Sequence, residues 1–237
     1  WANSGIVVPL IVGARVVGTL ECWSRQGNLF TADDERILEL MASQVATAVV
    51  AADTHEASER DAHRDPLTGL ANRRQLAKDI RDWLIPAIAG GRKAALGMAD
   101  IDQFKRFNDE YGHRVGDVTL QRVAEVLRHS LRPQDVVYRY GGEEFAIVIL
   151  DADPEDVEAV LERVREAVAR TPLTGEGLQP AGPVTISIGF ATVPPNGGDP
   201  EHLLKLADRA LYHSKRTGRD RVTMFSPGLD EPVAAAA

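Results

Sequence analysis

The chain has 237 residues, of which 44% are hydrophobic and 26% charged, and its formal net charge is −8. This composition supports a buried core and excludes wholesale disorder. The negative charge excludes nonspecific binding to a nucleic acid polymer, because such binding needs a basic surface. The single cysteine, Cys22, cannot form an internal disulfide, and no run reaches the roughly 20 apolar residues of a membrane-spanning helix. We therefore expect a cytoplasmic protein with no membrane segment in this chain.

The N-terminal stretch predicts a β-hairpin followed by a helix. Two β-branched, apolar runs, Ile6–Leu10 and Arg15–Trp23, flank a Val-Gly-Ala-Arg turn. Thr31 is the expected N-cap of the helix, with Asp34 in the position that completes a capping box. Because the chain opens at Trp1 rather than at a Met, we expect a piece of a longer protein, with an upstream signal or anchor left open.

The helix after Thr31 has an apolar seam whose partner the sequence leaves open. The seam steps by three and four residues as far as Ala52, and polar residues continue the same register beyond it. It either packs on the hairpin of its own chain or joins two chains in a dimer. The polar continuation predicts a helical signalling linker over residues 53–64. The seam consists of Leu38, Met41, Val45, Ala48 and Ala52.

The Asp-Pro-Leu-Thr-Gly-Leu stretch at residues 65–70 marks the start of a second domain, because proline disfavours helical conformation in the residue before it. Beyond it, the order β-αα-β-β-α-β predicts a ferredoxin-like, split βαβ sheet with helices on one face. We expect a disordered tail over residues 227–237. The predicted helices cover about residues 72–85, 102–110, 115–131, 154–170 and 200–216, and the predicted strands cover residues 94–100, 136–140, 144–150, 184–191 and 221–225.

Two glycines and two glutamates lie between predicted strands 136–140 and 144–150. Gly141 and Gly142 fit a two-residue primed hairpin turn, in which both central residues need positive φ. That turn does not explain Glu143 and Glu144. Strand alternation sends the side chains of these two glutamates to opposite faces.

A second acidic site, Asp100-Ile101-Asp102, closes the predicted strand 94–100. If a right-handed helical crossover joins this strand to strand 136–140, the two run parallel and end at the same sheet edge. Asp100 and Glu143 then converge, and converging carboxylates repel each other unless a cation lies between them. Carboxylate oxygens suit Mg²⁺ or Mn²⁺, whereas an isolated Asp-x-Asp pair is more often a solvated cap.

Five segments together resemble the GGDEF family of diguanylate cyclases, in the family's order over about residues 61–226. Glu143, at the third signature position, is a common active variant of that family. Asp220 departs from the usual Asn, which puts a local structural contact in doubt. The resemblance implies an α+β, nucleotidyl-cyclase palm-like domain over residues 65–226, with a mostly antiparallel five-stranded sheet flanked by helices. The segments are residues 65–74 (DPLTGLANRR), 100–113 (DIDQFKRFNDEYGH), 116–117 (GD), 141–145 (GGEEF) and 207–219 (ADRALYHSKRTGR).

The resemblance also implies a reaction, in which two GTP molecules condense to cyclic di-GMP with loss of two pyrophosphates. It implies two Mg²⁺ or Mn²⁺ ions per active site, held by Asp100, Glu143 and the backbone carbonyl of Ile101. Glu144 is then a further metal ligand or a general base. Since the product needs two GTP molecules and one domain binds one, the resemblance also implies a homodimer with two-fold symmetry.

Other residues match the family positions that bind GTP. Asn108 and Asp117 match the residues on the guanine, where a carboxylate accepts from N1–H and the N2 amine, a donor pair that adenine lacks. Lys215 and Arg219 match the residues that hold the phosphates, with help from Lys105. Their spacing of four along the last predicted helix and its end places Lys215 and Arg219 on one face, although an ordinary solvated face has the same spacing.

A regulatory motif precedes the signature. Arg132-Pro-Gln-Asp135 has the spacing of the family's inhibitory product site, where Arg offers a planar fork of donors and Asp accepts from guanine. The alternative is an ordinary turn between a helix and a strand. Arg163, on the helix after the signature, matches the family's secondary arginine.

Residues 1–52 resemble the last part of a GAF sensory domain, much less than a whole one. The resemblance rests on residues 8–10 (VPL), 17–21 (VGTLE), 30–34 (FTADD) and 40–49 (LMASQVATAV). We interpret Cys22 as a buried strand thiol and His55 as a solvated helix residue, rather than as cofactor ligands.

We thus expect an active diguanylate cyclase domain behind a partial sensor. One alternative is a catalytically inactive receptor that binds cyclic di-GMP through Arg132 and Asp135, and the intact Asp100, Glu143, Lys215 and Arg219 speak against it. Another is a cyclase with altered base choice, against which Asp117 speaks.

Overall fold

The computed structural model describes residues 2–172, 182–193, 196 and 198–229, without the side chains of residues 53–61. The chain forms two compact units, residues 1–62 and residues 63–237. None of the described helices is long and apolar enough to cross a membrane.

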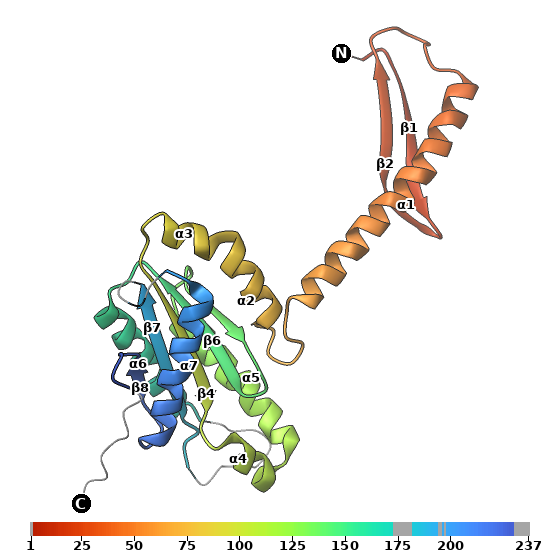
Figure 1. Cartoon of the computed structure of the whole chain (residues 1–237). Coiled ribbons are helices and arrows are strands. Elements are labelled where there is room, and N and C mark those ends of the chain that lie inside the picture. Colours follow the sequence, from red (N-terminus) through yellow and green to blue (C-terminus); the bar gives the residue numbers. More distant parts are fainter. Residues whose placement is uncertain (1, 173–181, 194–195, 197, 230–237) are drawn as a thin grey trace, which may run out of the picture. The chain divides into compact units, whose positions relative to one another are not determined.

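The first unit is a hairpin with a long helix (Figure 1). Strand β1 (Ser4–Val12) pairs antiparallel with β2 (Arg15–Ser24), and helix α1 (Ala32–Ala62) follows. The expected capping box is present, since the backbone N–H of Thr31 donates to Asp34 Oδ2 at 2.8 Å and that of Asp34 donates to Thr31 Oγ1 at 3.4 Å. The hydrogen bonds from Thr31 lower the pKa of Asp34.

The apolar surface of α1 is divided between two stripes. One stripe is buried against the hairpin, while Met41 and Val45 of the predicted seam face away from it and are 54% and 37% exposed. The hairpin therefore covers only part of the seam and leaves Met41 and Val45 uncovered within this unit. The polar continuation of the seam lies among residues whose side chains are outside the described set. The buried stripe consists of Leu38, Ala42 and Ala46, which pack with Val8 and Leu10.

The second unit contains a six-stranded sheet in the order β3-β5-β6-β4-β7-β8. All five predicted strands are present, and the sixth, β3, is a two-residue pairing beside β5. Strand β4 is antiparallel to both of its neighbours, and β5 runs in the direction of β4 one strand away. The carboxyl ends of β4 and β5 therefore lie at one edge, as predicted. The strands are β3 (Ala71–Asn72), β4 (Ala94–Ile101), β5 (Val136–Arg139), β6 (Glu144–Leu150), β7 (Ile186–Val193) and β8 (Val222–Met224).

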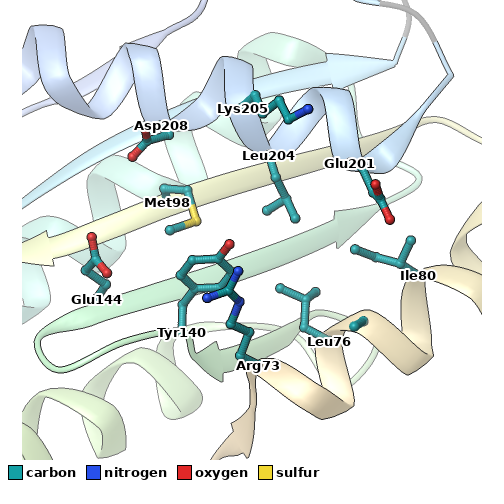
Figure 2. Close-up of a pocket in the computed structure, with 11 residues that line it drawn as sticks. Arg73, Leu76, Ile80, Met98, Tyr140, Glu144, Glu201, Leu204, Lys205 and Asp208 are labelled. Carbon is teal, nitrogen blue, oxygen red and sulfur yellow. The ribbon is translucent and has the colours of Figure 1, made fainter.

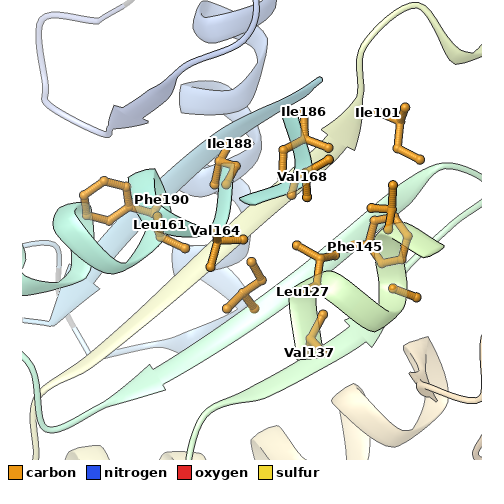
Figure 3. Close-up of a cluster of buried hydrophobic side chains, with 14 of the residues drawn as sticks. Ile101, Leu127, Val137, Phe145, Leu161, Val164, Val168, Ile186, Ile188 and Phe190 are labelled. Carbon is orange, nitrogen blue, oxygen red and sulfur yellow. The ribbon is translucent and has the colours of Figure 1, made fainter. Parts of the chain in front are cut away.

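Helices cover both faces of this sheet, so the expectation of helices on one face is wrong. The reason lies in β4, which is buried at all eight positions and therefore needs apolar cover on both sides. Helices α4, α5 and α6 pack on one face, where Figure 3 shows the apolar cluster around Leu127 and Phe145. Helices α2 and α7, with the π-helical turn η1, cover the other face. The helices are α2 (Arg73–Asp79), η1 (Ile80–Leu84), α3 (Ile85–Ala89), α4 (Phe104–Tyr111), α5 (His113–Ser130), α6 (Pro154–Arg170) and α7 (Pro200–Arg216).

The turn between β5 and β6 also differs from the prediction. The N–H of Tyr140 donates to the carbonyl of Glu144 at 2.8 Å, so the loop has three residues, 141–143. Neither Gly141 nor Gly142 has positive φ. Instead of a primed turn, the Arg139 guanidinium closes the loop by donating to the carbonyls of Gly141 and Gly142, at 3.2 and 2.8 Å.

The C-terminal residues are only partly described. Within the expected disordered tail, residues 227–229 form a turn, and Leu229 packs against the cluster beneath α2 and α7. Residues 230–237 lie outside the described set.

Candidate active site

The carboxyl end of β4 brings acidic side chains together. Asp100 is 4% exposed, and its register partner on β6 is Glu144. The N–H of Ile101 donates to the carbonyl of Glu143 at 3.3 Å, which holds the signature loop against the end of β4. The sequence-predicted convergence of Asp100 and Glu143 is therefore present, with Ile101 between them.

Lys215 supplies a cation to this edge from the last turn of α7. Its Nζ lies 2.8 Å from Asp100 Oδ2. Helix α7 can approach the sheet this closely because β7 has a glycine beneath it. A Cβ on Gly189 would lie 1.9 Å from the backbone nitrogen of Leu211 and 2.4 Å from the carbonyl oxygen of Ala207.

The electrostatics of this edge favour a further cation. Burial raises the pKa of Asp100, although the Lys215 ammonium opposes the shift. Burial also raises the pKa of Glu143, and the neighbouring Asp100 carboxylate adds to that shift. The positive charge of Lys215 therefore does not fully offset the negative charges of the two ionised carboxylates. A divalent cation between them would stabilise both.

The donor set fits Mg²⁺ or Mn²⁺, which prefer hard oxygen ligands and keep several positions for water or phosphate. Asp100 and Glu143 supply two carboxylates at this edge. The role of the Ile101 carbonyl as a ligand stays a prediction. Among the described residues, no group of three or more His, Cys, Asp or Glu side chains is arranged to hold a metal. An ion here would therefore depend on backbone and phosphate oxygens as well as on the two carboxylates.

Asp102 does not belong to this cation site, although it is only two residues from Asp100. Its carboxylate accepts from the hydroxyls of Thr185 and Ser187, at 2.7 and 2.6 Å, and from the N–H of Asp220 at 3.1 Å. Asp220, the departure from the family pattern, also pairs with an Arg165 guanidinium nitrogen at 2.6 Å. These bonds tie the loop after α7 to the sheet.

The two residues expected on the guanine are neighbours across the α4–α5 junction. Asn108 Oδ1 lies so close to Gly116 that a Cβ there would be 1.8 Å from it, and Asp117 follows directly. Asn108 Oδ1 is buried without a hydrogen-bond partner in the described part of the chain. The buried Asn108 Oδ1 suits a ligand that presents an N–H donor. Lys105 is exposed on α4.

Arg219 is not placed as its spacing predicts. Helix α7 ends at Arg216, and Arg219 has a left-handed backbone with φ of 63° after Gly218 at 127°. The argument that Lys215 and Arg219 share a helix face is therefore wrong, because the helix stops between them. The Arg219 side chain is exposed and pairs with no carboxylate among the described residues.

The residues of the expected inhibitory site gather at the opposite end of β5. The N–H of Arg132 donates to Asp135 Oδ2 at 3.1 Å, while Asp135 Oδ1 is buried without a partner in the described residues. Arg163 donates to the carbonyl of Ser130 at 3.0 Å. Four residues of β5 separate this motif from the signature loop, a length of about 13 Å.

The comparisons with known proteins agree with this fold. A family model described as diguanylate cyclase, GGDEF domain, matches residues 62–221, and a GAF domain model matches residues 2–50. The chain belongs to the GGDEF diguanylate cyclase family. Both resemblances inferred from the sequence are confirmed, as is the α+β class with a central sheet flanked by helices.

Named relatives share the second unit. The probable diguanylate cyclase DgcT of Escherichia coli is 41% identical over 165 residues, which are 69% of this chain and 36% of the relative. The response regulator PleD of Caulobacter vibrioides is 39% identical over 158 residues, 67% of this chain and 35% of the relative. The chain therefore spans about a third of the length of these relatives.

Two solved structures are matched over almost their whole length. The coiled coil and GGDEF domain of DgcB from Caulobacter crescentus, in complex with c-di-GMP, superposes with a TM-score of 0.73 at 34% identity. That match covers 79% of this chain and 98% of the solved chain. A GGEEF domain of a diguanylate cyclase from Vibrio cholerae matches with a TM-score of 0.60 at 29% identity, over 66% of this chain and 98% of the solved chain.

Sequence reasoning missed one ion pair of this GGDEF domain. Asp65 Oδ1 accepts from Arg139 Nη1 at 2.8 Å and from the N–H of Thr68 at 2.8 Å. Although burial alone raises the pKa of Asp65, these hydrogen bonds hold it below its usual value. Since Arg139 also closes the signature loop, Asp65 at the domain entrance is tied to the catalytic edge. The motif at residues 65–74 contained the signal, but it indicated only a boundary.

We expect Asp65→Asn to lower the free energy of unfolding by about 1–2 kcal/mol at neutral pH, the range of a partly exposed charge-assisted hydrogen bond. Because the folded pKa of Asp65 is depressed, its stabilisation is present above the unfolded value of about 3.9 and is lost as pH falls through the lower folded value. Urea unfolding at several pH values measures this. A difference from wild type that does not narrow below about pH 4 contradicts the assignment.

Proposed function

We propose that the second unit is an active diguanylate cyclase, which condenses two GTP molecules into cyclic di-GMP and two pyrophosphates. The observation that carries the proposal is the edge at which Asp100, Glu143 and Lys215 converge on a GGDEF fold. Asp100, Glu143 and the carbonyl of Ile101 would hold two Mg²⁺ or Mn²⁺ ions. When bound, such ions stabilise the attacking 3′-oxygen and the leaving oxygen of an in-line displacement.

The residues of the chain bind and orient GTP around that edge. Asn108 and Asp117 accept hydrogen bonds from guanine, so ATP would leave the Asp117 carboxylate unpaired. Lys215 now compensates Asp100, and with a bound nucleotide its ammonium and the Arg219 guanidinium neutralise phosphate oxygens. Lys105, exposed on α4, adds a further positive charge.

Incubation with GTP and Mg²⁺, followed by mass spectrometry, tests the proposal. We expect cyclic di-GMP and two pyrophosphates per product. Binding of cyclic di-GMP without turnover would instead support an inactive receptor. An adenine-containing dinucleotide from a GTP and ATP mixture would support altered base choice.

The second part of the proposal is product inhibition. Arg132, Asp135 and Arg163 present donors and a buried, unpaired carboxylate oxygen away from the catalytic edge. This donor and acceptor set suits the phosphates and guanines of cyclic di-GMP. Product bound here restrains the approach of two catalytic units without displacing the metal ligands.

We expect Arg132→Ala to leave the initial rate within about twofold of wild type, because no residue of the catalytic edge changes. The variant should continue to form product after wild type has stalled. Progress curves with cyclic di-GMP titrated in check both statements, with Arg128→Ala, in the last turn of α5, as the matched control. Identical stalling in wild type and Arg132→Ala would show that this motif is only a turn.

We also propose that the active form is a homodimer, because the product contains two GTP residues joined by reciprocal attacks. Met41 and Val45, left uncovered by the hairpin, supply an apolar contact between two copies of α1. The contact is short, so the dimer should be weak.

We expect the specific rate to rise with protein concentration and Met41→Glu to depress it, because a charge in the contact opposes pairing. Ser43→Glu places the same charge on another side of α1 and is the control. Rates proportional to enzyme down to nanomolar concentration, with monomers by sedimentation, would contradict the dimer.

A further inference from the structure

The turn after α7 carries Arg219 and has a strained backbone. Gly218, Arg219 and Asp220 have consecutive positive φ values of 127°, 63° and 45°. Glycine adopts such a backbone freely and aspartate tolerates it, whereas arginine rarely does. A conformation of this kind persists only where the surrounding structure fixes it. The position of the Arg219 guanidinium therefore depends on the contacts that hold this turn.

Hydrogen bonds to the backbone fix part of the turn. The N–H of Arg219 donates to the carbonyl of Ser214 at 2.9 Å, and Arg221 Nε donates to the carbonyl of Arg219 at 3.1 Å. The N–H of Asp220 donates to Asp102 Oδ2 at 3.1 Å. None of these bonds uses the side chain of Asp220. Its carboxylate is therefore available to join the turn to another element.

Arg165 of α6 binds that carboxylate. Its Nη1 lies 2.6 Å from Asp220 Oδ1, and its Nε donates to Glu162 Oε2 at 2.6 Å. A planar guanidinium that is bonded through two of its nitrogens has one orientation, so it fixes the place of Asp220 as well. Because the two acidic partners are 39% and 43% exposed, these ion pairs contribute little to stability. Their main effect is on position.

The Arg165–Asp220 pair joins elements that cover opposite faces of the sheet. Helix α6 packs on one face and α7 on the other, and the turn leads from α7 into β8 at the edge of the sheet. The other ion-pair partners of Arg165 within the described residues are Glu162 and Glu166, and neither is a proposed ligand of metal or nucleotide. Arg165 can therefore influence the site only through Asp220.

We propose that Arg165 is a positioning residue for GTP binding, because its bond to Asp220 holds the turn from which Arg219 meets the phosphates. The inference rests on the proposed function, in which Arg219 binds phosphate. Without the bond, the turn relaxes toward negative φ, and the Arg219 guanidinium is no longer held in one place. The nucleotide then loses part of its phosphate contact, while the guanine site at Asn108 and Asp117 is unchanged.

A double-mutant cycle on nucleotide binding tests this role. 3′-deoxy-GTP has no attacking hydroxyl, so its calorimetric Kd with Mg²⁺ reports binding without turnover. Arg165→Met keeps the length of the side chain and removes its donors. We expect it to weaken this Kd by about fivefold to tenfold, within the effect of one hydrogen bond. In an Arg219→Gln background, the same substitution should change the Kd by less than about twofold, because the guanidinium that Arg165 positions is absent.

Two further variants control the test. Arg170→Met removes a guanidinium from the same helix, where Arg170 pairs with Glu166, and should leave the Kd unchanged. Asp220→Gly removes the carboxylate but keeps the N–H, and glycine fits the positive φ, so the bond to Arg165 is lost without new strain. It should weaken the Kd as Arg165→Met does, and the two changes together should have no larger effect than either alone.

The outcomes are distinguishable. A Kd in Arg165→Met within about twofold of wild type overturns the inference, and so does an equal loss with and without Arg219, because the effect is then a general loss of structure. If wild type binds 3′-deoxy-GTP with this coupling but forms no cyclic di-GMP from GTP, the proposed activity fails and the positioning role stands. Thermal melts show whether each variant is folded. If Arg165→Met is not, the cycle between Asp220→Gly and Arg219→Gln gives the same test.

Discussion

We expect Glu143→Gln to lower the turnover of GTP by on the order of a hundredfold to a thousandfold, the scale of losing one electrostatic stabiliser in an active site. The substitution keeps the shape of the side chain and removes its charge. With this carboxylate gone, Asp100, which Lys215 contacts at 2.8 Å, is the one carboxylate left of the proposed pair, so the edge binds a divalent cation less tightly. Cyclic di-GMP binding at Arg132 and Asp135 should persist, because that motif lies at the far end of β5.

A second measurement on Glu143→Gln does not depend on activity. Burial and the Asp100 carboxylate raise the pKa of Glu143, so its ionised form destabilises the metal-free fold at neutral pH. We expect the variant to melt at or above the wild-type temperature without Mg²⁺ and to gain less stability when Mg²⁺ is added. Glu158→Gln on α6 is the control. Near-normal turnover together with an unchanged Mg²⁺ response would remove Glu143 from the metal site.

The convergence of Asp100 and Glu143 was predictable because local signals and topology agree there. Asp100 closes a continuous apolar strand, Glu143 follows two glycines at a strand junction, and the shared direction of β4 and β5 places both residues at one sheet edge. The turn itself was not predictable from its glycines. Arg139 closes that loop with side-chain hydrogen bonds, and its own orientation depends on Asp65, far away in the sequence.

Arg219 shows a different limit of sequence reasoning. Spacing of four residues implies a shared face only while the helix continues, and α7 ends at Arg216. Gly218 and Arg219, which has a left-handed backbone, then turn the chain. The next residue, Asp220, is held by hydrogen bonds to Asp102 and Arg165. These hydrogen bonds join segments that are distant in the sequence, so no local pattern indicates them.

A cavity of about 450 Å³ between α2 and α7 (Figure 2) had no signal in the sequence for the same reason. Arg73 and Tyr140 come from separate motifs, and Asp208 lies in a helix predicted only from its periodicity. Their meeting depends on helices covering both faces of the sheet. A sheet with helices on one face only, as the sequence predicted, would have no such cavity.

The close approach of α7 to β7 leads to the second large effect that we expect. Gly189→Ala should lower the free energy of unfolding by about 3 kcal/mol, the upper part of the usual range for an overpacked core. The added Cβ would meet the backbone at Leu211 and Ala207, at 1.9 and 2.4 Å, and a backbone cannot rotate aside as a flexible side chain can. The helix must therefore move outward from the sheet.

That movement should also reduce activity in molecules that remain folded. Lys215 reaches Asp100 from the last turn of α7, so an outward shift of the helix lengthens the 2.8 Å contact and displaces the ammonium proposed to hold phosphate. Gly97→Ala on the adjacent strand β4 is the matched control, because its Cβ would have no neighbour closer than 3.7 Å. Urea unfolding gives the stability of both variants, and turnover is compared at a temperature well below both melting points. Wild-type stability and turnover in Gly189→Ala would show that the spacing of α7 does not set the position of Lys215.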